Sequence, residues 1–203
     1  MDFFVSSLSK VTQSMYEHDI THVISLLRGD EMEEVLLPPR FNRTNWLRLD
    51  MDDVIADFKA YAIGVLRKKQ DDERWAYEEW TRLRDNPRLY RDLDKTAEAD
   101  TIVDACKEKC KSNNWNLMFL TAVPKGNDVK WAFYDKVHWA AIRYPEIPVM
   151  FGPYSHDKHV HCKLGDVLID DRTSNCEEWR HAGGVAIQHR GDVDKTLQEI
   201  SNL

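Results

Sequence analysis

Short apolar runs alternate along this chain with longer segments of helical pattern, and this alternation restricts the folds that the chain can adopt. Six runs have the length of a β-strand and lie at residues 21–27, 46–50, 117–123, 147–151, 166–169 and 184–188. Helical patterns occupy residues 96–111, 131–144, 175–182 and 193–201. Apolar strands without polar alternation are typical of parallel sheets buried on both faces. The sequence therefore predicts an α/β fold with a doubly wound parallel sheet.

One stretch, at about 58–95, breaks the alternation. It is rich in Arg, Asp, Glu, Trp and Tyr and contains no strand-like run. We therefore expect a small helical cap, inserted after the run at 46–50. The chain has 203 residues, which is enough for one catalytic domain with a well-buried core and such an insertion. We expect this domain at 46–203, preceded by an N-terminal appendage at 1–45 that adds one extra strand.

Charge and hydropathy argue against two classes of partner. The formal net charge of -7 argues against a large nucleic-acid-binding face, because such faces neutralise many phosphates with Lys and Arg. No segment approaches the roughly 18 consecutive apolar residues that a membrane span requires. The first residues lack the pattern of a secretory signal, and four cysteines are too few for a disulfide scaffold. We expect a cytoplasmic protein that binds neither a nucleic-acid polymer nor a membrane.

Paired carboxylates follow two of the apolar runs. Asp50 and Asp52 stand at the end of the first run, in the segment DMDDVIADF. Asp170 and Asp171 follow a later run, in the segment GDVLIDDR. In an open α/β sheet such positions lie at the carboxyl edge, where ligands bind. Either pair alone is compatible with a solvated turn, but two pairs at one edge favour Mg2+, which prefers oxygen ligands and relieves the repulsion between neighbouring acids.

Two further side chains are expected at the same edge of the sheet. Thr121 lies within the run at 117–123, where its hydroxyl can hydrogen-bond a phosphate oxygen. Lys158 lies shortly before the run at 166–169 and can neutralise phosphate charge from a loop above the sheet. Lys163 is a competing candidate for that role.

In this order, DMDDV, Thr121, Lys158 and the acid pair at 170–171 resemble the four sequence motifs of phosphatases of the haloacid dehalogenase superfamily. In that superfamily a cap can be inserted between the first and the second motif. The resemblance covers roughly residues 46–200 and implies a Rossmann-like sheet. It further implies that Asp50 is the nucleophile and forms an aspartyl-phosphate. Asp52 would protonate the leaving oxygen and later activate water, and Thr121 and Lys158 would stabilise the transferring group.

The resemblance also implies a magnesium cofactor. Its ligands would be the carboxylate of Asp50, the backbone carbonyl of Asp52 and a carboxylate from Asp170 or Asp171. The sequence leaves open which of the two neighbouring acids is the direct ligand.

The segments DMDDVIADF and LIDDR, together with Trp179 and the AGG at 182–184, are further similar to the 5'-nucleotidases that dephosphorylate deoxyribonucleoside monophosphates. That branch implies a nucleoside monophosphate as the small-molecule substrate. Phe58 would line the base pocket, while Lys136 and Arg172 would lie near the substrate phosphate. Asp53 departs from the branch, which usually has glycine at that position, and adds a negative charge beside the expected metal.

Two other functions remain compatible with these residues. The chain could be a phosphatase of the same type that acts on another small ester, such as a sugar phosphate. It could also be a nucleotide-binding protein with weak or no turnover. Aromatic side chains of the cap can stack on a base or fill the cap's own core, and they are Trp75, Tyr77, Trp80 and Tyr90. The appendage at 1–45 is a candidate for homodimer contact.

Overall fold

The computed structural model describes residues 44–203, without 68–76, 87, 125–128 and 130. The chain divides between Arg43 and Thr44, and only the second unit, Thr44–Leu203, is described. The strand expected at 21–27 therefore lies outside the described residues, as do nearly all of the appendage expected at 1–45 and Trp75 in the expected cap.

Five parallel strands form one sheet, in the order β3-β2-β1-β4-β5. The chain winds outward from the central strand through β2 to β3, and then returns to the other side of β1 with β4 and β5. This arrangement confirms the predicted Rossmann-like, doubly wound α/β fold, and it places the switch in strand order beside β1. The strands are β1 (Trp46–Leu49), β2 (Asn116–Thr121), β3 (Val149–Phe151), β4 (Val167–Asp170) and β5 (Val185–Gln188).

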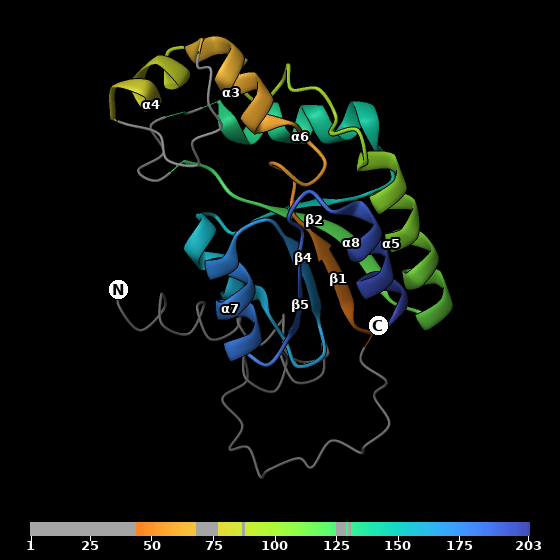
Figure 1. Ribbon diagram of the computed structural model, residues 1–203. Helices are drawn as coiled ribbons and strands as arrows, with labels where there is room; N and C mark the ends of the chain where they lie inside the picture. Colours follow the sequence, from red (N-terminus) through yellow and green to blue (C-terminus); the bar gives the residue numbers. More distant parts are fainter. Residues whose placement is uncertain (1–43, 68–76, 87, 125–128, 130) are drawn as a thin grey trace, which may run out of the picture. The chain divides into compact units, whose positions relative to one another are not determined.

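Helices cover both faces of the sheet (Figure 1). On one face α5 (Ala99–Asn113) packs against α8 (Val193–Ser201), and on the other α7 (Thr173–His181) packs against β4 and β5. A 3-10 helix, η2 (Ser155–His161), contacts α7 and is an addition to the predicted elements. The predicted helices end within a few residues of the observed ones, which is the usual uncertainty at helix termini.

Alternate residues of β4 enter different cores, so this strand is buried on both sides. In β4, Val167 and Ile169 belong to the larger core, which also contains the apolar residues of α5 and α8. Leu168 points to a second cluster with Trp179 and Cys176 of α7. A strand with this environment has no solvent-facing side, and this explains why its apolar residues are consecutive.

The inserted segment contributes two helices beyond the carboxyl ends of the strands. These are α3 (Phe58–Leu66) and α4 (Tyr77–Arg84), which contact one another and lie on the same side of the sheet as α6 (Ala132–Arg143) (Figure 1). The indole of Trp139 in α6 donates a hydrogen bond to the carbonyl of Leu93 at 2.7 Å. Arg91 pairs with Asp135, also in α6, at 3.1 Å. The end of the insertion is thus attached to α6 by polar contacts.

Within the described part of the chain, no helix has both the length and the apolar character that crossing a membrane would require. All four cysteines are described, and none forms a disulfide. Burial raises the pKa of Cys110 to about 11 and that of Cys176 to about 12, so both are protonated thiols at neutral pH.

Candidate active site

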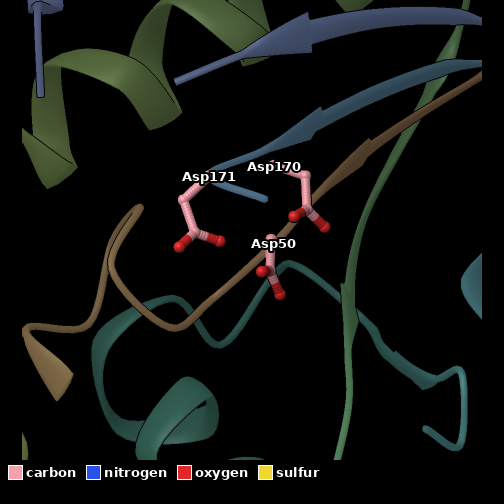
Figure 2. A group of neighbouring side chains, drawn as sticks. All are labelled: Asp50, Asp170 and Asp171. Carbon is pink, nitrogen blue, oxygen red and sulfur yellow. The ribbon is translucent and has the colours of Figure 1, made fainter. Parts of the chain in front are cut away.

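The carboxyl edge of the sheet brings together acids from two strands (Figure 2). Asp50 follows β1 directly, Asp170 is the last residue of β4, and Asp171 comes next. The backbone N–H of Asp50 donates to the carbonyl of Ile169 at 2.9 Å, which fixes the two strand ends side by side. One carboxylate oxygen from each of the three acids lies within 4.8 Å of the other two. Two motifs far apart in the sequence therefore form one acidic cluster.

Lys158 lies between two of these acids. It belongs to η2, and its side chain leaves only 2% of its surface exposed. Its Nζ is 2.7 Å from Oδ1 of Asp50 and 2.6 Å from Oδ2 of Asp170. Buried charges are tolerated when they are paired in this way. Of the two lysines considered from the sequence, Lys158 is the one whose ammonium group contacts the acids, whereas the backbone N–H of Lys163 donates to Asp166 away from the cluster.

A second lysine organises the other two predicted catalytic residues. Lys136 comes from α6, its side chain is 1% exposed, and its Nζ donates to Oδ2 of Asp52 at 2.6 Å and to Oγ1 of Thr121 at 3.0 Å. Thr121 is the last residue of β2 and is completely buried. The Asp52 side chain is 31% exposed, but its second oxygen, Oδ1, is buried and has no hydrogen-bond partner in the described part of the chain.

Asp170 is held from several sides. The side-chain amide of Asn175 donates to both of its oxygens, at 2.9 and 3.0 Å. The backbone N–H of Arg172 donates to Oδ1 at 2.9 Å, and Lys158 donates to Oδ2. Asp171 forms no side-chain hydrogen bond within the described residues. Asn175 is a functional candidate that sequence reasoning missed, although its place in the first turn of α7, shortly after the acid pair, was an available signal.

Arg172 lies at the exposed rim of the cluster. Its side chain donates from Nη1 to Oγ of Ser155 at 3.0 Å, and the hydroxyl of Ser155 donates to Oδ1 of Asn175 at 3.0 Å. This chain of hydrogen bonds connects the guanidinium group to the residue that orients Asp170. The predicted phosphate-side position of Arg172 is therefore next to the acids, but its charge faces solvent.

Burial makes the acids costly to ionise together. Burial raises the pKa of Asp50 to about 7, although the charge of Lys158 opposes this rise. Burial, followed by the charges of Asp50 and Asp170, raises the pKa of Asp171 to about 8. The cluster thus contains more carboxylates than its one lysine neutralises, and a divalent cation would favour their ionised forms. The three converging carboxylates of Asp50, Asp170 and Asp171 are a donor set that fits Mg2+.

Asp53, the departure from the nucleotidase pattern, has a clear structural role. Its φ is 59°, a left-handed conformation that glycine adopts most readily and that Asp tolerates better than most residues. Its Oδ1 accepts the backbone N–H of Lys59, in the first turn of α3, at 2.7 Å. Burial raises the pKa of Asp53 to about 6, and this hydrogen bond opposes the rise. The carboxylate therefore connects the loop after β1 to the first cap helix.

The aromatic residues of the cap pack on one another. Phe58 is 8% exposed, stacks on Tyr90 with ring centroids 5.8 Å apart, and meets Trp80 edge-on at 5.9 Å. Trp75 is outside the described residues and the side chain of Tyr77 is not described. The ring of Phe58, predicted to line a base pocket, thus has other rings of the cap as neighbours.

A scan of the chain against protein-family models found no match, and a search of curated proteins found no sequence with significant similarity.

Proposed function

We propose that this chain is a Mg2+-dependent phosphomonoesterase that works in the manner of the haloacid dehalogenase phosphatases its motifs resemble. The observation that carries this proposal is the pairing at one sheet edge. Lys158 contacts Asp50 and Asp170, while Lys136 contacts Asp52 and Thr121. In this proposal Asp50 is the nucleophile, Asp52 transfers the proton, and the two lysines are buried cations beside the ends of the parallel strands. Such a set suits a reaction that transfers an anionic phosphoryl group.

In the first step a carboxylate oxygen of Asp50 attacks phosphorus. A bond forms between that oxygen and phosphorus while the bond from phosphorus to the ester oxygen breaks. Asp52 gives its proton to the departing oxygen, which leaves as an alcohol. Because Lys136 holds Oδ2 of Asp52, the unpartnered Oδ1 is the oxygen available to carry that proton. Lys158 and the hydroxyl of Thr121 stabilise the negative charge on the transferring group.

In the second step Asp52 accepts a proton from a water molecule, whose oxygen attacks phosphorus. The bond between phosphorus and Asp50 breaks, and inorganic phosphate and the free carboxylate result. A bound Mg2+ would screen the negative charges of carboxylate and phosphate from each other.

The hydrogen bonds around the acid pair suggest how the metal would be held. Asp50 and Asp171 are suited to be direct carboxylate ligands, with the backbone carbonyl of Asp52 expected as a third. Both oxygens of Asp170 already accept hydrogen bonds from Asn175, so Asp170 is suited to orient the cluster rather than to give up those partners. Such supporting residues commonly fix the geometry of metal ligands.

We further propose a nucleoside 5'-monophosphate, and a deoxyribonucleotide in particular, as the substrate. This part rests on the motif resemblance and on the aromatic cap near the edge that carries the acids. One observation favours the alternative of another small phosphate ester: Phe58 and Tyr90 stack on each other, so their facing surfaces are already occupied. A comparison of substrates must decide between the two.

The test is phosphate release from deoxyribonucleoside and ribonucleoside monophosphates and several sugar phosphates, in Mg2+ or EDTA. Wild type is compared with Asp50→Asn, and Asp104→Asn is the matched control because Asp104 is exposed on α5. We expect Mg2+-dependent release that prefers deoxyribonucleotides, disappears in Asp50→Asn and persists in Asp104→Asn.

Other results would correct specific parts of the proposal. Release from sugar phosphates alone would keep the mechanism and discard the nucleotide. Full activity in Asp50→Asn would refute the nucleophile. A folded wild type that releases phosphate from nothing would favour a binding protein without turnover.

A further inference from the structure

Lys136 is a buried cation whose surroundings come from three parts of the fold. Its Nζ donates to Asp52, in the loop after β1, and to Thr121, at the end of β2. The centroid of the Tyr90 ring lies 4.4 Å from the same Nζ, and Tyr90 belongs to the inserted segment. An ammonium group has three hydrogens, and two of them serve Asp52 and Thr121. The ring face is in place to receive the third by a cation–π contact.

The ring of Tyr90 is itself fixed by the cap. It is 3% exposed and stacks on Phe58 at an interplanar angle of 17°. Phe58 opens α3, and its other aromatic neighbour, Trp80, lies in α4. Rings from successive parts of the insertion therefore form a series that ends on the ammonium group of Lys136. These rings therefore connect the insertion, through Lys136, to Asp52, the predicted proton-transfer residue.

We propose that Tyr90 is a positioning residue, whose ring holds the Lys136 ammonium group against Asp52 and Thr121. Folding of the inserted segment over the sheet edge then completes the catalytic arrangement. The cap thus acts on the reaction itself, in addition to any contact with the leaving group. The effect on catalysis rests on the proposed phosphatase function, whereas the placement of Lys136 by the ring does not.

The test compares Tyr90→Phe, which keeps the ring, with Tyr90→Leu, which removes it. Tyr144→Leu is the matched control, because Tyr144 is also a buried tyrosine, 4% exposed, and packs on Trp139 and Phe119 in the main core. Two properties are measured in each protein: steady-state phosphate release, and the NMR shift of the Lys136 ε-methylene signal, assigned with Lys136→Arg.

We expect the ring current of Tyr90 to shift the Lys136 signal in wild type and in Tyr90→Phe, and this shift to disappear in Tyr90→Leu. Loss of a desolvated cation–π contact should lower kcat by about 10- to 30-fold in Tyr90→Leu, with KM less affected because Asp52 acts in the chemical step. Tyr90→Phe should recover most of the rate. Tyr144→Leu should lower the melting temperature while keeping kcat and the Lys136 shift.

Two results would overturn the proposal. One is an unshifted Lys136 signal in folded wild type. The other is an active wild type in which folded Tyr90→Leu has an unchanged kcat. If wild type hydrolyses nothing, the proposed function fails, and binding of inorganic phosphate in Mg2+, measured by calorimetry, replaces kcat. A weaker affinity in Tyr90→Leu than in Tyr90→Phe would then support the positioning role, and equal affinities would refute it.

Discussion

Replacing Lys158 by methionine would remove a buried charge between two buried carboxylates. In the wild type its ammonium group lies 2.7 Å from Asp50 and 2.6 Å from Asp170. Removing one partner of a buried ion pair costs about 3–5 kcal/mol, because the remaining charge loses its compensation. Burial already raises the pKa of Asp50 from 3.8 to about 7 with Lys158 present, so ionisation of this carboxyl group is costly even before the change. We expect Lys158→Met to lower the free energy of unfolding by about 3–5 kcal/mol at about pH 8 in EDTA.

The decrease in unfolding free energy caused by Lys158→Met should be larger at high pH than at low pH. A carboxyl group whose pKa is raised on folding destabilises the fold increasingly as the pH rises from its unfolded pKa towards its folded pKa. Removal of Lys158 raises the folded pKa of Asp50 further. The loss should therefore be largest near pH 8 and smaller near pH 5, where the folded form keeps its proton. Added Mg2+ should recover part of the loss at the higher pH, because it supplies another cation to the same carboxylates.

Urea denaturation followed by far-UV circular dichroism measures these free energies at both pH values, with Mg2+ or EDTA. Lys107→Met is the matched control, since Lys107 is a partly exposed lysine that pairs with the exposed Glu146. Such surface pairs contribute about 1 kcal/mol or less, so the control should unfold close to wild type. Equal unfolding free energies for Lys158→Met and wild type at pH 8 in EDTA would refute the electrostatic reasoning.

Two further predictions concern residues beside the site and in the core. Asn175→Ala removes both amide contacts to Asp170 and should weaken Mg2+ binding by about 10- to 100-fold. The Mg2+ dependence of the melting temperature measures this affinity. An unchanged dependence would argue against a metal at this site. Burial lowers the pKa of His189, whose Nδ1 forms a hydrogen bond with the hydroxyl of Thr196. Because the folded state favours the neutral ring, stability is lost as the pH falls below 6.5. His189→Asn should show a shallower fall in unfolding free energy between about pH 7 and about pH 5, and an unchanged slope would contradict this reasoning.

The acidic edge could be predicted from the sequence because it depends on local properties. Consecutive apolar residues identify buried strands, and parallel strands place all their carboxyl ends at one edge. Asp50, Thr121 and Asp170 were therefore expected at one edge of the sheet, although the order of the strands along that edge was not predicted. The structure places them there, and the shared register of Leu49 with Phe119 and Ile169 is the reason.

Contacts between side chains that are far apart in the sequence could not be predicted in the same way, because no sequence pattern indicates them. Lys136 and Asp52 are 84 positions apart, and no periodicity connects a helix residue to a loop residue over such a separation. Lys136 was predicted beside the phosphate, but its contacts with Asp52, Thr121 and Tyr90 depend on tertiary packing that no local sequence pattern specifies. The same applies to Asn175, whose partner is set by how α7 packs on β4.

The opposite end of the sheet gives a second example. Arg48 lies within a strand predicted as buried, and its Nη1 pairs with Asp166 at 2.6 Å, a contact between residues 118 positions apart. The guanidinium group also lies over the ring of Trp179, 5.3 Å from its centroid. A charge in an apolar strand indicates a buried partner, but it does not identify that partner.

The central position of β1 has a consequence for how the protein is made. This strand is synthesised before the other four, yet its neighbours in the sheet are β2 and β4, and Trp46 pairs with Asn116 while Leu47 pairs with Val167. Pairings between such distant segments form slowly, because the intervening chain must first be closed into a loop. During synthesis, one edge of β1, the strand that leads to Asp50, therefore stays unpaired until β4 has left the ribosome. A nascent chain that stops before β4 would contain Asp50 but would lack Asp170 and Asp171, so the acidic cluster could not form.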